Sequence, residues 1–326
     1  MNNLYPLKFN PVFRDKIWGG DRIRTVLGMD FSPLPNCGEA WVLSGVPGSQ
    51  TLVSNGFLKG NELNELVEIY MDELLGESVF DKFKDEFPLL IKFIDSNDYL
   101  SIQVHPDDAL AAKRKIGNGK SEMWYFMHAE KDAELISGFN RKIDQKIYLD
   151  HLEKKNLREI LNTEKVKAGD VFYIPAGRIH ALGPGLLLAE IQQTSDTTYR
   201  IYDWDRVDEN GVSRELHTEL ALEAIDYTFH DSYRTSYPKT KNQLTTLVDS
   251  PHFFTSVLDF NRPLTRDYGF LDSFVICLCV EGSALVKYDQ GKIELKKGEV
   301  LLVPAVMEEI SLLPSPECRI LEVYIP

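Results

Sequence analysis

Apolar and polar residues alternate along the chain in a pattern that predicts a mainly β protein. Short apolar runs bounded by Gly, Pro and Asn, such as 39–44 and 171–175, are typical of strands that end in tight turns. The nearly continuous apolar run at 88–95 indicates a strand buried on both faces. Similar short strands recur from residue 245 to the end. Many short strands with regularly spaced turns indicate a barrel or a sandwich.

A second pattern predicts a few helices. Apolar residues recur at three- and four-residue steps over 61–86, with a break near Gly76, as in an amphipathic helix. Three more helical segments are predicted, at about 107–115, 141–162 and 213–227. Ser213 is the expected N-cap of the last one. The polar stretch 228–242 has no periodicity and contains Pro238, so we interpret it as a linker.

An internal repeat accompanies these strands. Lys167–Ala176 and Lys296–Ala305 share the pattern K-x-G-[D/E]-V-x-x-[I/V]-P-A, 129 positions apart. Two copies of one β module explain this similarity. The pattern resembles the second motif of the cupin β-barrel, in which a metal-binding histidine follows the proline. That residue is His180 in the first copy, whereas the second copy has Glu309 at the matching position.

We therefore expect two cupin-like (jelly-roll) β-barrel domains with a few covering helices. The first, 1–240, is expected to bind metal and to carry the helical segments. The second, 241–326, is expected to lack metal ligands.

The composition limits the kinds of molecule that the chain is expected to bind. With 36 basic and 50 acidic residues the net charge is −14, and no basic tract offers a surface for nucleic acid or for an anionic membrane. No apolar run reaches the roughly 18 residues that a spanning helix requires, and no secretory pattern opens the chain. The four cysteines are too few and too scattered for a disulfide framework. We expect a cytoplasmic protein with reduced, buried thiols.

Four polar residues on predicted strands could form a metal site. Alternation places Gln103 and His105 on one face of their strand, and Glu122 and His180 stand on others. Two imidazoles, a carboxylate and an amide oxygen suit a divalent first-row metal such as zinc, with one position open. Spacing alone leaves the other interpretation open, in which the histidines are ordinary buried or surface residues.

Four motifs, in a fixed order along the chain, resemble those of a known family, and this resemblance favours the metal site over ordinary histidines. The chain resembles the type I mannose-6-phosphate isomerases, in their short bacterial form, over essentially its whole length. The motifs are S-I-Q-V-H-P-D-D (101–108), G-K-S-E-M-W-Y (119–125), P-A-G-R-I-H-A-L-G-P-G (175–185) and L-A-E-I-Q-Q-T-S-D-T-T-Y-R (188–200).

The resemblance implies a site and a reaction. The ligands of one zinc ion would be Gln103, His105, Glu122 and His180. Ser101 and Lys120 would line the substrate pocket, Glu190 and Arg200 would be catalytic, and Arg206, where longer relatives have lysine, would bind substrate. The implied reaction interconverts mannose 6-phosphate and fructose 6-phosphate by proton transfer between C1 and C2 through a cis-enediol. The partner would thus be a phosphorylated hexose.

Several alternatives stay open at this point. Arg200 could instead pair with Asp196 or Asp203, and we interpret Asp196 as its structural partner. Lys92 is a further candidate for the phosphate, and the general base is not identified. Leu182 stands where many relatives have an aromatic residue. A cupin oxygenase with iron at the same ligands and a non-catalytic sugar-binding cupin are the other functions that we weigh, and the oligomeric state is undetermined.

Overall fold

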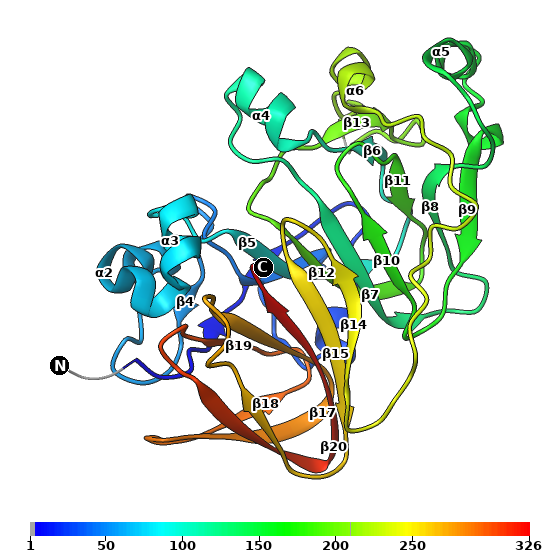
Figure 1. Cartoon of the computed structure of the whole chain (residues 1–326). Helices are drawn as coiled ribbons and strands as arrows, with labels where there is room; N and C mark the ends of the chain where they lie inside the picture. The colour runs from blue at the N-terminus through cyan, green and yellow to red at the C-terminus, as the bar shows by residue number, and fades with distance from the viewer. Residues whose placement is uncertain (1–3, 209) are drawn as a thin grey trace.

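Three antiparallel β-sheets form successive layers in the computed structural model, which describes residues 4–208 and 210–326 (Figure 1). The central layer has six strands, in the order β10 (Val171–Ile174), β7 (Glu122–Ala129), β12 (Leu186–Gln193), β5 (Leu89–Ser96), β3 (Glu39–Leu43) and β2 (Val12–Arg14). The second sheet has the order β13 (Tyr199–Tyr202), β6 (Ile102–Val104), β11 (His180–Leu182), β8 (Glu134–Phe139) and β9 (Leu161–Lys165). A two-stranded sheet pairs β1 (Phe9–Asn10) with β4 (Leu52–Val53).

The third sheet is built from the C-terminal part of the chain. Its main path is β14 (Leu244–Asp249), β15 (Phe254–Phe260), β20 (Glu309–Tyr324), β17 (Val275–Tyr288) and β18 (Gly291–Lys296). Two more strands, β16 (Leu264–Asp267) and β19 (Val300–Val303), pair with β20 and β17. Because β17 and β20 are long and each pairs with several strands, the sheet curls around its own apolar core. The mainly β, cupin-like fold expected from the sequence is confirmed.

Burial explains why β5 and β12 read as continuous apolar runs. Every residue of both strands is buried, because the six-stranded sheet is covered on each face. On one face Trp124 and Leu188 pack against Leu135 of the five-stranded sheet. On the other face a larger core joins this sheet to the C-terminal sheet, where Ile276 and Leu278 are fully buried. The space between the five- and six-stranded sheets is where the polar site lies.

Helices cover the ends and the outer face of these layers. They are α1 (Arg22–Thr25), α2 (Leu63–Leu75), α3 (Glu77–Phe83), α4 (Asp108–Arg114), α5 (Gln145–Glu153), the 3₁₀ helix η1 (Leu157–Glu159) and α6 (Thr218–Ala224). Buried residues of α5 and α6, Tyr148 and Ala221, pack on the outer face of the five-stranded sheet. None of the helices in the described part of the chain is long and apolar enough to span a membrane.

The structure moves the ends of two of the predicted helical segments. Within 141–162 it has two short helices, α5 and η1, and the helical segment ends before Leu161–Lys165, which is strand β9, paired with β8. The backbone hydrogen bonds that β8 offers outweigh the local helical pattern. In 213–227 the helix begins at Thr218 with His217 as its N-cap, because Ser213 is held in a bridge with Val207.

The two copies of the repeat adopt the same local structure. In each, a glycine with positive φ, 82° at Gly169 and 90° at Gly298, closes a turn before a four-residue strand, β10 or β19. This backbone conformation favours glycine at both positions. In the second copy Glu309, the counterpart of His180, opens β20 as an exposed residue.

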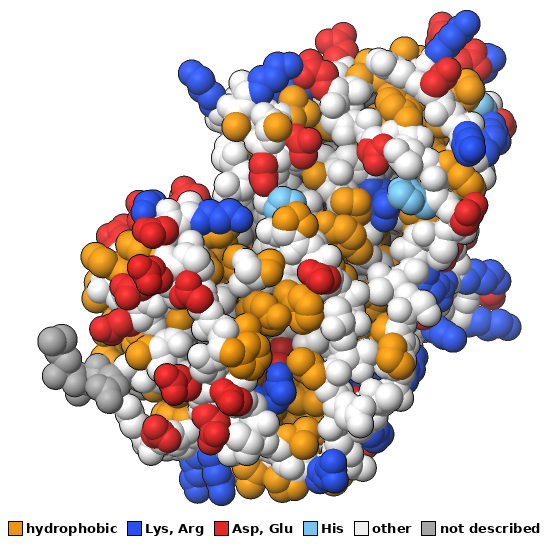
Figure 2. Space-filling view, viewed as in Figure 1, with side chains coloured by type: hydrophobic (Ala, Val, Ile, Leu, Met, Phe, Trp, Pro, Cys, Tyr) orange, Lys and Arg blue, Asp and Glu red, His pale blue; other side chains and the backbone are white. Residues whose placement is uncertain are grey.

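The charges on the surface and the state of the cysteines agree with the composition. Figure 2 shows basic side chains standing among acidic ones on the face in view. The four cysteines are buried free thiols, as expected.

Candidate active site

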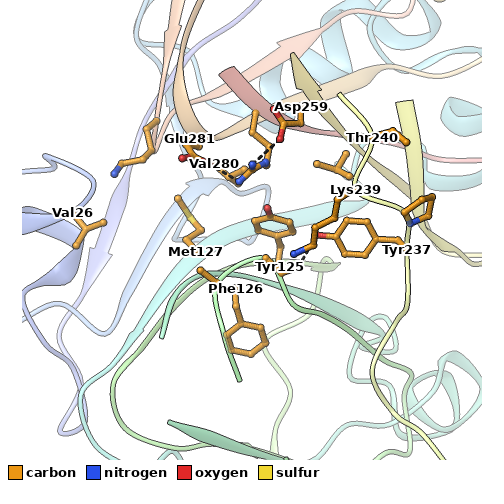
Figure 3. A pocket seen from close by; sticks show the side chains of 16 residues that line it. Val26, Tyr125, Phe126, Met127, Tyr237, Lys239, Thr240, Asp259, Val280 and Glu281 are labelled. Carbon is orange, nitrogen blue, oxygen red and sulfur yellow. Dashed lines mark hydrogen bonds and ion pairs between the residues drawn. The ribbon is translucent and has the colours of Figure 1, made fainter. Parts of the chain in front are cut away.

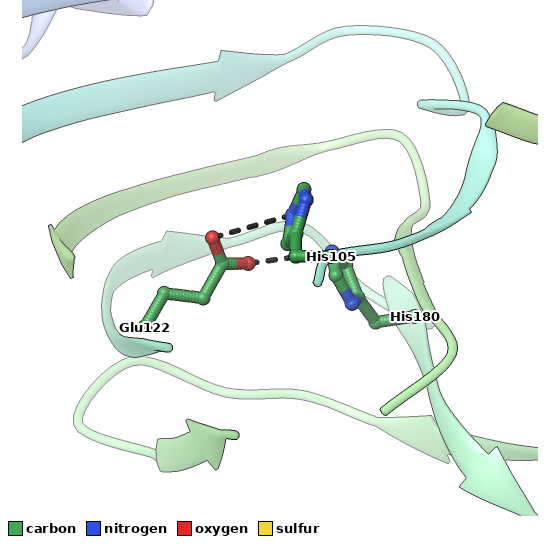
Figure 4. A group of neighbouring side chains, drawn as sticks. All are labelled: His105, Glu122 and His180. Carbon is green, nitrogen blue, oxygen red and sulfur yellow. Dashed lines mark ion pairs between the residues drawn. The ribbon is translucent and has the colours of Figure 1, made fainter. Parts of the chain in front are cut away.

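Three strands bring His105, Glu122 and His180 together between the two N-terminal sheets. His105 follows β6, and Glu122 and His180 are the first residues of β7 and β11. Their potential ligand atoms all lie within 4.8 Å of one another, and the three side chains are almost fully buried. Figure 4 shows the Glu122 carboxylate facing both imidazoles. The strands thus bring together three side chains that are far apart in the sequence.

Hydrogen bonds fix the orientation of both imidazoles. His105 Nδ1 donates to the Thr197 carbonyl and His180 Nδ1 donates to the Arg178 carbonyl, each at 2.9 Å. Since a carbonyl only accepts, the proton sits on Nδ1 and the Nε2 lone pair faces the centre. Burial lowers the pKa of His105 well below its usual value and that of His180 to about 4. Neutral imidazoles held by a backbone carbonyl are the form in which histidine binds metal.

The Glu122 carboxylate supplies the negative charge of the centre. Its oxygens lie 3.6 Å from His105 Nε2 and 3.3 Å from His180 Nε2. Both are buried, and neither has a hydrogen-bond partner in the described part of the chain. Burial raises the pKa of Glu122, and the charge of Glu190 adds to the effect. An orphaned buried carboxylate beside two imidazole lone pairs fits a divalent cation, which would compensate the charge.

Two further polar side chains adjoin this group. The Gln103 amide nitrogen lies 3.1 Å from His180 Nε2, and rotating the amide by half a turn would present its oxygen instead. Lys120 is buried, with Nζ 3.3 Å from His105 Nε2 and 3.6 Å from Glu122 Oε2. Gln103 thus lies beside the group as the sequence predicts, and Lys120 stands at the metal end of the site.

A cavity of about 260 Å³ opens beside the group and is lined by the buried ion pair of Lys92 and Glu190 and by Glu39. Glu190 accepts from Trp124 Nε1 at 2.7 Å and pairs with Lys92 Nζ at 3.0 Å. Burial alone would raise the pKa of Glu190, but the Lys92 ammonium outweighs it, so the pKa is lowered. Burial likewise opposes ionisation of Glu39, yet Lys92 and Lys16 lower the pKa of that carboxyl to about 2. Glu190 is therefore an ionised acceptor facing the cavity.

Arginines form the other end of the cavity. Arg200 lines it and donates to the Glu215 carbonyl at 2.8 Å, and burial lowers its pKa. Arg214 also lines it and is held by a two-pronged pair with Asp203, through Nε at 2.7 Å and Nη2 at 2.6 Å. Arg200 forms no ion pair within residues 4–208 and 210–326. Cationic charge therefore exceeds anionic charge at this end.

Two residues named from the sequence, Ser101 and Arg206, lie elsewhere than in the cavity lining, and a third, Lys92, lines it with its charge already paired. Arg206 turns back onto Asp203, with Nη2 2.6 Å from Oδ1, and reaches Asp98 at 3.5 Å. Ser101 is buried just before β6 and does not line the cavity. Lys92 does line it, but its ammonium is already paired with Glu190. The substrate roles of Ser101 and Arg206 stay predictions.

The structure changes the interpretation of two other residues. Asp196 is exposed, lines the cavity and forms no ion pair among the described residues, so it is not the structural partner of Arg200. Arg214 is the cavity residue that the sequence did not single out. In the sequence Arg214 is a single arginine before helix α6, which is a weak indication of a functional role. Its ion pair with Asp203 in the structure shows where it lies.

The fold and the site together define a cupin-like protein with a candidate metal site and a small polar cavity. Residues 6–136 match the family model for the type I phosphomannose isomerase catalytic domain, and residues 243–325 match that for the mannose-6-phosphate isomerase cupin domain. A putative mannose-6-phosphate isomerase of Bacillus subtilis is 36% identical over 312 residues, 94% of this chain and 95% of its own length. The mannose-6-phosphate isomerase ManA of the same organism is 36% identical over 319 residues, covering 96% of this chain and 97% of the relative.

Solved structures agree with these matches. The crystal structure of a mannose 6-phosphate isomerase from Bacillus subtilis superposes with a TM-score of 0.87 at 35% identity, covering 98% of this chain and 99% of that one. A phosphomannose isomerase from Salmonella typhimurium, at 17% identity and a TM-score of 0.79, shares the fold. The chain belongs to the type I mannose-6-phosphate isomerases, a family of metal-dependent aldose–ketose isomerases. This membership favours the isomerase over the oxygenase and the non-catalytic cupin.

Proposed function

We propose that the chain interconverts mannose 6-phosphate and fructose 6-phosphate with one zinc ion held by Gln103, His105, Glu122 and His180. The observation that carries the metal site is the Glu122 carboxylate, buried without a hydrogen bond between two inward-facing imidazoles. Three nitrogen and oxygen donors with a fourth position beside them suit zinc, which has no redox chemistry of its own. When bound, the metal would supply Lewis-acid stabilisation of negative charge on the sugar oxygens.

Glu190 is the group that we assign to proton transfer. It faces the cavity, and Lys92 keeps it ionised in a site that excludes most water. In the forward direction it would take the proton from C2 of the open-chain sugar and return it to C1, while the proton of the C2 hydroxyl passes to the C1 oxygen. The enediol is then formed and consumed without net loss of a proton. The Trp124 N–H and the Lys92 ammonium fix the carboxylate during both transfers.

The arginine end of the cavity fits the rest of the substrate. Arg200 carries a permanent charge with no paired carboxylate, so it would hold or polarise a sugar oxygen near the enediolate. Arg214 presents Nη1, the nitrogen that its pair with Asp203 leaves free, and a phosphate is the natural acceptor. Lys120, at the opposite end, would contact the sugar oxygens beside the metal. Arg206 would act behind Arg214 by holding Asp203.

A coupled assay tests this function. Protein stripped with a chelator and reloaded with zinc is given mannose 6-phosphate, and fructose 6-phosphate is measured. We expect turnover from the zinc-loaded protein and little from the stripped protein. Absence of turnover with zinc confirmed on the protein would contradict the proposal, and activity restored by iron alone would contradict the choice of metal. The cytoplasmic location expected from the sequence belongs to the same proposal.

A further inference from the structure

A second cavity lies on the opposite face of the strand that carries Glu122. It measures about 430 Å³ and shares no lining residue with the active-site cavity. Along β7, Glu122 and Trp124 face the active site, whereas Tyr125 and Met127 face the second cavity (Figure 3). This division follows from the two-residue period of a strand. The two cavities thus lie back to back across one strand.

Segments distant in the sequence line the second cavity. Besides β7 and Val26, they are the turns of the two repeat copies, represented by Gly169 and Lys297, the stretch 237–240 that leads to β14, and the strands β15, β17 and β20 of the C-terminal sheet. Lys297 occupies the place in the second repeat that Ala168 holds in the first. The cavity therefore forms only where the N-terminal and C-terminal parts of the chain meet.

An arginine that lines this cavity is held by two carboxylates. Arg319 donates to Asp259 at 2.7 Å and forms a close pair with Glu281. The hydroxyl of Tyr125, a residue only 2% exposed, points toward this cluster. The carboxylates retain lone pairs that can accept from hydroxyl groups. The cluster thus offers both acceptors and donors in a fixed arrangement.

Two lysines at the edges of the cavity have no carboxylate partner. Lys239 and Lys297 line it, and no ion pair of either appears within the part of the chain that the structure describes. Lys239 Nζ lies 5.9 Å from the centre of the Tyr237 ring, beside Gly169. Because Arg319 is neutralised by its partners, these two ammonium groups are the charges left for an anion.

We propose that this cavity is a second binding site, for a phosphorylated sugar. The free ammonium groups of Lys239 and Lys297 suit a phosphate. Asp259 and Glu281 can accept from sugar hydroxyls, and the ring of Tyr237 offers a face for sugar C–H groups. The carboxylates would repel a polyanion, and the volume lies in the range of small-molecule sites. No group of candidate metal ligands lies here among the described residues, so the site binds without catalysing.

The side chain of Met127 reports directly on this cavity. The chain has six methionines, and Met127 alone lines the cavity, whereas the active-site cavity contains none. Methyl-labelled methionine gives one NMR signal per residue, and Met127→Leu identifies the relevant one. Glucose 6-phosphate is the probe and glucose the comparison. Glucose 6-phosphate bound in the active site would also be able to move this signal, because Met127 lies on β7 with Glu122 and Trp124. The lysine variants below therefore decide where the probe binds, and they leave the active-site residues of the proposed function unchanged.

The deciding comparison uses two double variants with the same change of charge. Lys239→Ala/Lys297→Ala removes the ammonium groups of the cavity, and Lys287→Ala/Lys292→Ala removes two exposed ones that do not line it and form no ion pair among the described residues. We expect glucose 6-phosphate to shift the Met127 signal saturably in the parent and in the second variant. In the first variant the apparent Kd should rise about tenfold, the effect of losing charge-assisted contacts. An unmoved Met127 signal, equal titrations in both variants, or an equal response to glucose would overturn the proposal.

Discussion

Replacing Arg214 by methionine tests which arginine meets the phosphate. Arg214 and Arg206 share the carboxylate of Asp203, but only Arg214 lines the cavity. Nε and Nη2 of Arg214 are bound to Asp203, which leaves Nη1 for the substrate. All three Arg206 nitrogens already face Asp203 or Asp98, at 2.6 to 3.5 Å.

The size of the expected loss in kcat/KM follows from the loss of one hydrogen bond between charged groups, Arg214 and the phosphate. Such a bond contributes about 1.5 to 3 kcal/mol. Arg214→Met should therefore lower kcat/KM for mannose 6-phosphate by about 10- to 150-fold, mostly through KM. Arg206→Met removes a partly exposed ion pair with Asp98 and one of the two arginines that hold Asp203. Because Arg214 still holds Asp203 and Arg206 does not line the cavity, KM should change by less than about fivefold, the equivalent of about 1 kcal/mol.

Steady-state kinetics with the coupled assay measure both variants. Bound metal and the thermal unfolding midpoint serve as controls, because Asp203 keeps one arginine in either variant. A large rise in KM for Arg206→Met together with unchanged kinetics for Arg214→Met would refute the reasoning and restore Arg206 as the phosphate contact.

Three further predictions concern the metal, the core and the acid range. His180→Ala should lose the bound metal, whereas Arg200→Ala should keep the metal and lose most of kcat. Metal analysis and steady-state kinetics measure both effects. A near-normal kcat in Arg200→Ala would contradict the role assigned to Arg200. Leu278→Ala, in the fully buried core shared by two sheets, should lower the free energy of unfolding by about 2 to 5 kcal/mol in urea titrations, and a loss below about 1 kcal/mol would show that the core is not shared in this way. Glu39 has a pKa of about 2 in the folded chain against 4.5 in its usual range, so its ionised form stabilises the fold above about pH 4.5 and this contribution is lost as the pH falls toward 2. Glu39→Gln should therefore have a lower Tm than the parent at neutral pH, and the difference in Tm between the two proteins should narrow as the pH falls from about 4.5 toward 2. A difference in Tm that does not depend on pH would show that Glu39 stabilises the fold through packing instead.

Local patterns placed some residues of the metal end of the site, but did not establish the site as a whole. Alternation correctly placed Gln103 and His105 on one face, and the repeat placed His180 shortly after a strand and a proline. Each of these predictions depends only on residues close in sequence. Convergence with Glu122 needed the resemblance, because strand order cannot be read from spacing.

The arginine end of the cavity shows why the rest of the site could not be predicted from the sequence. After β13 the chain reverses through Trp204 and Asp205, both with positive φ, which non-glycine residues rarely adopt. That turn sends Arg206 back onto Asp203 and away from the cavity. Arg214 takes the place beside Arg200 after a further loop. No local signal in the sequence marks two consecutive left-handed residues of these types. The resemblance, which named Arg206, therefore did not show that Arg214 is the arginine that lines the cavity.

Anomalous diffraction at the zinc edge, from crystals of protein shown to be active, tests the central claim most directly. The account predicts one strong peak per chain, within bonding distance of Nε2 of His105 and His180 and of the Glu122 carboxylate. Active crystals with no zinc peak at this position, or with the peak at another site, would contradict it.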